Sequence, residues 1–212
     1  DNGKTWTTAD GKAIETPVRD LDNPCLILDA QSKGQNVYIK DVNFDSNDNP
    51  VILYVTSYGH QPGPQNGPRE WFTANWTGKE WKFNESTHNY DSGCIFVENN
   101  RCWTVIGPSE PGPQLWGTGG ELAVWTTKNS GKSWRKDKDL TSDSPYNHGY
   151  VRRPYNAHDP FLYFWCDGNP DRMTKSHLYF GDSKGNMWVL PYDMEAEWEK
   201  PEVFGVAKKM DR

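Results

Sequence analysis

The sequence predicts an all-β protein, a β-propeller of four-stranded antiparallel blades. The main observation is a repeated turn: Gly-Lys-x-Trp occurs at 3–6, 78–81 and 131–134, with a looser copy, Gly-Asn-Met-Trp, at 185–188. Counted from glycine to glycine, the copies lie 75, 53 and 54 residues apart, and a strand-like apolar run precedes each copy after the first. A repeat of about 40–55 residues with one turn and one tryptophan per unit is typical of propeller blades.

The composition agrees with this fold. Only 34% of residues are hydrophobic, yet 14% are aromatic, and the chain holds 11 Trp, 19 Gly and 15 Pro. Aromatic strands and frequent turns fit such a composition better than helical packing does. The net charge is −6, and no run of basic residues exceeds Lys208-Lys209, which argues against a nucleic-acid partner. No apolar stretch approaches the 18 residues of a membrane span.

Apolar runs and turns divide the chain into blades at about 37–83, 94–136 and 150–190. The first blade is expected to contain strands at 37–44, 51–57, 70–76 and 81–83. The second is expected to contain strands at 94–98, 101–106, 121–126 and 133–136. The third is expected to contain strands at 150–157, 161–166, 177–181 and 187–190.

The two ends of the chain are expected to extend this array. Residues 1–36 are predicted to be part of a preceding blade, with an outer strand from Trp6 onward, and the tail 191–212 to be a loop or a partial closing strand. Three blades and a fragment cannot close a ring of the usual four to eight. We therefore expect the remaining blades of a larger protein to be the partner of this chain.

Two sets of residues resemble known families. The turn at 127–134, TKNSGKSW, resembles the Asp-box motif of BNR repeats, Ser/Thr-x-Asp-x-Gly-x-x-Trp, with Asn129 in the Asp place, and residues 1–6 match it from its Asp onward. The segments NVYIKDVNFDSNDNPVILYVTS, GPQNGPREWFTANWTGKEWKF, STHNYDSG, PSEPGPQLWGTGGELAVWT and NHGYVRRPYNAH look like a BNR-repeat family of polysaccharide-degrading bacteria. That family is similar to propeller-fold polysaccharide lyases of the ulvan lyase and rhamnosyl-glucuronate lyase type.

The resemblance implies several properties. The protein would be the C-terminal part of a seven-bladed propeller, located in the periplasm or outside the cell, and its partner would be a polysaccharide or oligosaccharide. It would cleave beside a uronic acid by β-elimination, using His, Tyr and Arg. A pair of catalytic histidines would lie upstream of residue 1.

The topology of a propeller indicates where such residues would meet. Loops between second and third strands share one face with the connections between blades, and functional residues concentrate on loops held by rigid strands. In this chain, that face would carry the segments 58–69, 84–91, 107–120 and 141–153. A lyase needs a cationic fork for the carboxylate, a base for the C5 proton and an acid for the leaving oxygen.

The candidates follow from these needs. The catalytic candidates are Arg69 and Arg152 for the carboxylate, His88 and His60 for the base, and Tyr54 or Tyr90 for the acid. The substrate-binding candidates are Trp116, Glu110, Arg153 and His148. Each also has a structural interpretation: a surface ion pair for Arg69, a loop staple for His88, a solvated loop residue for His60, strand packing for Tyr54, a blade wedge for Trp116, and packing between blades for one of the two adjacent arginines.

No cofactor is predicted, and a metal ion is left open. His148 and His158 could join a structural metal site. Asp45, Asn47 and Asp48 resemble a calcium-loop spacing, although any hairpin turn favours the same residues. The four cysteines show no zinc-like spacing, and free thiols are expected.

Two other functions stay open beside the lyase. A sialidase-like glycoside hydrolase is suggested by the Asp-box turns, and a non-catalytic glycan-binding propeller is suggested by the abundance of aromatic residues. All three share a carbohydrate partner.

Overall fold

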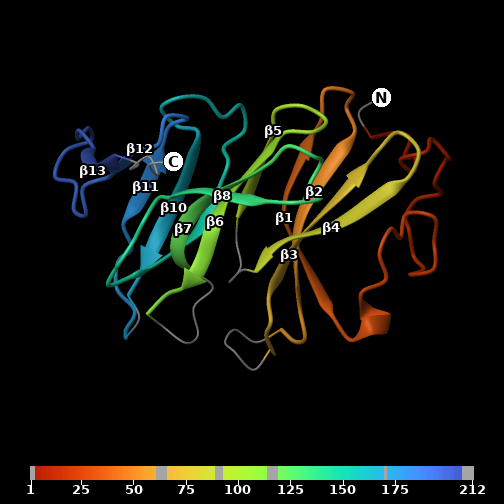
Figure 1. The fold of residues 1–212 in the computed structure, drawn as a ribbon, viewed down its shortest axis with the longest axis horizontal. Helices are drawn as coiled ribbons and strands as arrows, with labels where there is room; N and C mark the ends of the chain where they lie inside the picture. Colours follow the sequence, from red (N-terminus) through yellow and green to blue (C-terminus); the bar gives the residue numbers. More distant parts are fainter. Residues whose placement is uncertain (1–2, 61–65, 89–92, 114–118, 170, 207–212) are drawn as a thin grey trace.

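The computed structural model describes residues 3–60, 66–88, 93–113, 119–169 and 171–206. Apart from one short 3-10 helix, η1 (Gln31–Lys33), every regular element in these ranges is a β-strand, and all strand pairs are antiparallel (Figure 1). No helix of the described chain is long and apolar enough to cross a membrane.

The first sheet has four strands in sequence order. They are β1 (Asn36–Phe44), β2 (Pro50–Ser57), β3 (Glu70–Trp76) and β4 (Trp81–His88). The turn between β1 and β2 closes on the carboxylate of Asp45, whose Oδ1 accepts hydrogen bonds from the backbone N–H of Asn47 (2.8 Å) and of Asn49 (2.9 Å). This local use of an Asp side chain is the usual way in which a short turn satisfies its amides.

Two further groups of strands follow. The second group is β5 (Cys94–Val97), β6 (Trp103–Pro111), β7 (Gly120–Thr127) and β8 (Arg135–Asp139). The third is β9 (Asn147–Arg152), β10 (Tyr163–Gly168), β11 (Leu178–Gly181), β12 (Asn186–Val189) and β13 (Glu202–Val206). The Gly120–His148 pair links β7 to β9, so the hydrogen-bond ladder runs on from one group to the next. Within the tail 191–212, which was expected to be a loop or a partial closing strand, β13 pairs with β12.

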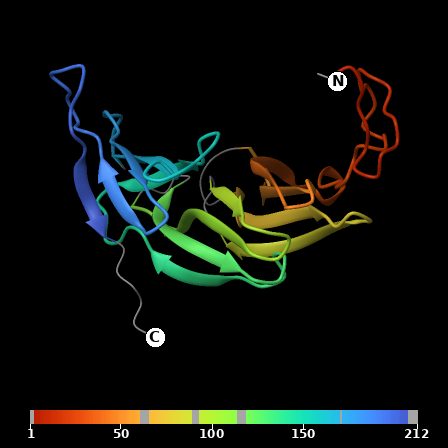
Figure 2. The ribbon, with the colours of Figure 1, turned by 90° about the horizontal axis from the view of Figure 1, so that it is seen from above.

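Apolar side chains fill the space between consecutive groups. From β2, the alternate residues Val51, Leu53 and Val55 join Trp71 of β3 against Ile95 of β5 and Trp103 and Val105 of β6. A second cluster joins the other face of the second group to the third, and it contains Cys94, Ile106, Leu122, Val124, Leu140, Val151, Tyr163, Trp165, Tyr179 and Met187. Figure 2 shows the three groups following one another around an arc, as consecutive blades of a partial propeller do.

The first strands of the three blades are tied together. Asp41 on β1 accepts a hydrogen bond from the backbone N–H of Ile95 on β5 (3.0 Å) and from Nε (3.3 Å) and Nη2 (3.2 Å) of Arg153, just after β9. Asn43 Nδ2 donates to the Ile95 carbonyl at 3.1 Å. One carboxylate therefore connects all three blades on their inner side.

The glycine of the repeated turn has a similar, positive φ in all four copies. Gly3, Gly78, Gly131 and Gly185 have φ of 80°, 86°, 80° and 89°, a region that glycine adopts without strain. The indole N–H of Trp6 donates to the Gly3 carbonyl at 3.1 Å, and that of Trp134 donates to the Gly131 carbonyl at 3.1 Å. In the turn at 127–134, Asn129 Oδ1 accepts from the backbone N–H of Ser133 at 3.0 Å, as the Asp of an Asp-box would.

The segment before β1 differs from the expectation. We expected an outer strand from Trp6 onward, but residues 3–35 contain only η1 and an isolated bridge between Thr7 and Ala13. A strand needs a neighbour to pair its backbone groups, and no strand of the described chain pairs with this segment.

Candidate functional site

The predicted face is built by the connections that follow β2, β6 and β10. These three strands end toward the same, lower edge in Figure 1. Arg69 directly precedes β3, whose first residue, Glu70, pairs with His88 at the end of β4. The structure therefore brings the backbones of Arg69 and His88 to adjoining positions of neighbouring strands. Tyr90 and Trp116 lie outside the described residues.

Tyr54 lies deeper in the first blade. It is the partner of Phe72, two pairs further into the sheet than Thr56–Glu70, and the two rings stack with centroids 5.4 Å apart. The residue is 4% exposed, and burial raises the pKa of its hydroxyl to about 12. Tyr54 is therefore protonated at neutral pH, as an ordinary tyrosine is, and is a weaker acid than an exposed one.

The other candidates occupy varied positions. His60 is exposed just after β2, and Glu110 forms an ion pair with Lys136 (Oε1 to Nζ, 3.0 Å). Arg152 is half-buried and donates from Nη1 to the Val151 carbonyl at 2.9 Å. The guanidinium of Arg153 forms an ion pair with Asp41, and this ion pair is part of the contact between blades described above.

His148 is part of the core. It is 2% exposed; its Nδ1 accepts from the indole N–H of Trp165 at 2.9 Å, and its Nε2 lies 2.7 Å from Ser144 Oγ. With Nδ1 accepting, the proton of the neutral ring is on Nε2 and is donated to Ser144. Burial lowers the pKa of His148 to about 4. A substrate would reach His148 only if the chain opened here.

The residues suggested for the two metal sites, His148 with His158 and Asp45 with its neighbours, make other contacts in the structure. Both nitrogens of His148 are engaged, and His158 Nδ1 lies 2.9 Å from the Asp159 carbonyl. Asp45 is used by its own turn. Among the described residues, no group of three or more His, Cys, Asp or Glu is arranged to hold a metal ion. All four cysteines are free thiols.

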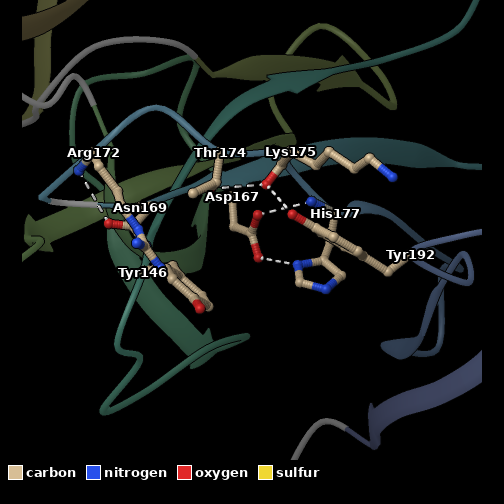
Figure 3. A pocket seen from close by; sticks show the side chains of 8 residues that line it. All are labelled: Tyr146, Asp167, Asn169, Arg172, Thr174, Lys175, His177 and Tyr192. Atoms are coloured by element: carbon tan, nitrogen blue, oxygen red, sulfur yellow. Dashed lines mark hydrogen bonds and ion pairs between the residues drawn. The ribbon is translucent and has the colours of Figure 1, made fainter.

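A cavity of about 320 Å³ opens at the end of the third blade (Figure 3). Its walls come from the start of β9, the end of β10, the connection between β10 and β11, and the segment after β12. The lining residues are Tyr146, Asp167, Asn169, Arg172, Thr174, Lys175, His177 and Tyr192. We call this cavity the third-blade pocket.

A buried carboxylate organises the third-blade pocket. The side chain of Asp167 is 3% exposed and accepts three hydrogen bonds: from the backbone N–H of His177 (2.8 Å), from His177 Nδ1 (2.8 Å) and from the hydroxyl of Tyr179 (2.7 Å). Burial and the bond to Asp167 raise the pKa of Tyr179, so its hydroxyl is a permanent donor. Asp167 thereby fixes the His177 ring, with Nε2 directed away from the carboxylate (Figure 3).

Aromatic and cationic side chains complete the walls. The rings of Tyr192 and His177 lie with centroids 4.5 Å apart, and the Tyr192 hydroxyl donates to the Lys175 carbonyl at 2.9 Å. Lys175 is paired with Asp193, and its ammonium lies 5.4 Å from the centre of the Tyr192 ring. Asn169 Oδ1 accepts from the backbone N–H of Arg172 at 3.2 Å, which shapes the loop that carries Arg172.

Of the residues that line this pocket, only Tyr146 lies in a segment predicted to be functional, the connection 141–153. The remaining lining residues went unassigned, although a signal was present. The connection between the second and third strands of the third blade, 169–177, is equivalent to 58–69 and 107–120, and it carries Asp, Arg, Lys and His. The rule that selected the other two loops also applies to this one.

Comparison with known proteins agrees with the fold. The chain matches a solved structure described as a new family of polysaccharide lyase, PL25 ulvan lyase, with a TM-score of 0.65 and 14% identity over 84% of this chain and 40% of that one. It also matches the ulvan lyase bound to -[GlcA(1-4)Rha3S]-, with a TM-score of 0.64, 13% identity and the same coverage. No protein-family model and no curated protein matches the chain.

These findings define the class of protein. The chain has a polysaccharide-lyase-like, all-β propeller fold, and it spans 40% of the length of the two lyase structures. At this identity the likeness establishes the fold, since one fold can carry several chemistries. Membership of the BNR-repeat family stays a prediction from the turn motif.

Proposed function

We propose that the protein is a carbohydrate-active, lyase-like propeller that cleaves an acidic polysaccharide beside a uronic acid. The observation that carries this proposal is the fold shared with ulvan lyases over 84% of the chain. One of those structures holds a glucuronate-containing oligosaccharide, which suggests an acidic glycan as the substrate here. A polysaccharide is too large to cross a membrane unaided, so we place the reaction in the periplasm or outside the cell.

The proposed chemistry uses the face at the ends of β2, β6 and β10. Arg69 would bind the uronate carboxylate and stabilise the charge that develops when the C5 proton leaves. Arg152, the second candidate, ends β9 and pairs with Phe164 near the start of β10, so it lies at the opposite edge of the third blade from this face. His88 or His60 would take the C5 proton. The electron pair would form the C4–C5 double bond as the C4–O bond breaks, and Tyr54 or Tyr90 would protonate the leaving oxygen.

Two features of the structure bear on this assignment. Arg69 directly precedes Glu70, which pairs with His88, so the backbones of the carboxylate-binding candidate and of one base candidate lie at the same edge of the first blade. Burial raises the pKa of Tyr54 to about 12, which makes it a weaker acid than an exposed tyrosine, so it would protonate the leaving oxygen only in close contact with it. Trp116 and Glu110 would bind neighbouring sugars.

The test is product analysis after incubation of the full-length protein, with its remaining blades, with glucuronate-containing polysaccharides. A lyase gives unsaturated products that absorb in the near ultraviolet, and we expect this absorbance to rise with time. New reducing ends without that absorbance would replace the proposal with a sialidase-like hydrolase. Binding without any product across these substrates would replace it with a non-catalytic glycan-binding propeller.

A further inference from the structure

We infer that the third-blade pocket is a separate binding site for a sugar residue that carries an anionic group, a carboxylate or a sulfate ester. This inference goes beyond the proposed cleavage, because binding here requires no turnover and none of the proposed catalytic residues. Those residues lie mainly on the first blade, whereas the pocket is lined by the third.

The pocket is built rather than incidental. Asp167 is buried and its three donors come from two residues of the same blade, His177 and Tyr179. A buried carboxylate is stable only when it is well hydrogen-bonded, and here those bonds fix an imidazole in a cavity. In its neutral form, His177 donates Nδ1–H to Asp167 and presents Nε2 as an acceptor, which suits a sugar hydroxyl.

The charges around the pocket point to an anionic ligand. Lys175 is already paired with Asp193, and Asp167 is satisfied by its three donors. Arg172 also lines the pocket, and the carboxylates of Asp193 and Asp167 already have other partners. A guanidinium fork binds a carboxylate or a sulfate with two parallel hydrogen bonds, so Arg172 is the group that would recognise the acid.

The remaining walls point to a sugar as the body of the ligand. Tyr146 and Tyr192 offer aromatic rings, and Asn169, Thr174 and the His177 Nε2 offer polar atoms. Apolar faces with a few placed polar groups are typical of small-molecule pockets, and a volume of about 320 Å³ lies at the small end of their usual range of about 300–1,000 Å³. The size suits a short piece of a glycan.

The experiment is an NMR titration of the labelled protein with glucuronic acid, glucose 6-sulfate and glucose as probes, observing the Arg172 side-chain N–H. We expect one or both acidic sugars to shift this resonance and glucose to leave it unchanged. A shift with glucuronic acid identifies a carboxylate as the recognised group, and a shift with glucose 6-sulfate identifies a sulfate. Equal shifts with glucose, or no shift with either acid, would overturn the inference.

Variants give the second reading. Arg172→Gln should weaken binding of the acidic sugar that shifts the resonance at least about ten-fold, because the charge-assisted hydrogen bonds of the guanidinium are lost. The affinity of Arg172→Lys should lie between those of the unchanged protein and Arg172→Gln. Arg135→Gln, which removes an exposed arginine of β8, is the matched control and should bind like the unchanged protein. Equal affinity in all variants would overturn the inference, whether or not the protein cleaves a glycan.

Discussion

Single buried polar residues determine much of the third blade. His148 and Asp167 are both buried, both fully engaged in hydrogen bonds, and both placed where β9, β10 and β11 meet. An unsatisfied polar group in such a position would cost about 1–3 kcal/mol, so these residues favour one arrangement of the strands. Their roles differ, because His148 faces the core and Asp167 faces the pocket.

His148 should make the protein sensitive to acid. Its folded pKa of about 4 lies below the unfolded value of about 6.5. Between these values the unfolded chain binds a proton that the folded chain does not, so the free energy of unfolding falls as the pH falls from 6.5 to 4. The loss approaches about 3 kcal/mol. Urea unfolding at a series of pH values measures it.

The control for this prediction is His158→Gln, which alters an exposed histidine and should keep the full pH dependence. His148→Gln should reduce the dependence of the free energy of unfolding on pH between 4 and 6.5. An NMR titration of the unchanged protein gives an independent check, and a His148 pKa near 6.5 in the folded state would contradict the account.

Asp167 should act as a positioning residue for His177. Asp167→Asn retains the size of the side chain but loses the charged acceptor, so we expect a loss of about 1–3 kcal/mol in stability. We also expect the Nδ1 proton of His177 to lose its carboxylate partner, which NMR of the imidazole nitrogens would detect. An unchanged Nδ1 signal in Asp167→Asn would show that the carboxylate does not hold the ring.

At the scale of elements, the repeated turn is the feature that links sequence to blade. All four motif glycines have φ between 80° and 89°. Their surroundings differ: a Cβ on Gly131 would lie 2.7 Å from Thr73 Oγ1 and 2.9 Å from the Trp103 ring, whereas a Cβ on Gly78 would meet nothing within 4 Å. The turn of the second blade is therefore also a contact with the first.

This difference can be measured with a matched pair of substitutions. Gly78→Ala should cost only the strain of the positive φ, about 1 kcal/mol. Gly131→Ala should cost that strain and an additional overpacking cost of about 1–3 kcal/mol. Thermal unfolding of both variants tests the expectation, and equal losses would mean that the contact between blades is loose at this turn.

The sequence predicted elements better than sites, for a physical reason. The Gly-Lys-x-Trp turn is local: its glycine conformation and its Trp-to-Gly hydrogen bond involve residues three positions apart. The third-blade pocket depends on four separate segments, and the environment of His148 depends on Trp165 and Ser144. Such environments require the register between strands, which the sequence pattern alone did not specify.

At the scale of the whole molecule, the inner contact at Asp41 joins blades that are far apart in sequence. Arg153 reaches Asp41 across 112 residues, and the same carboxylate binds the backbone of Ile95. The side chains of Arg153 and Asp41 are 20% and 17% exposed, so water screens their interaction only partly. In the described chain, Arg153 therefore contributes to the contact between the first and third blades.

A double-mutant cycle on Asp41→Ala and Arg153→Ala should reveal this link. Each single variant should lose about 2–3 kcal/mol, because it leaves the other partner without its counter-charge, and the coupling energy should exceed about 1 kcal/mol. The exposed pair Arg135–Asp137 is the control, with an expected coupling of about 0–1 kcal/mol. Similar coupling in both pairs would mean that the inner contact adds no cohesion between blades.

We propose above that this propeller cleaves beside a uronate by β-elimination, with Arg69 binding the carboxylate. The most direct measurement is the initial rate of increase of near-ultraviolet absorbance with a glucuronate-containing polysaccharide, compared among the unchanged full-length protein and its Arg69→Gln and Arg135→Gln variants. We expect a rate from the first and third proteins and a loss of about a hundred-fold or more in Arg69→Gln, as removal of a transition-state charge partner predicts. Equal rates in Arg69→Gln and Arg135→Gln, or no absorbance from the unchanged protein, would contradict the account.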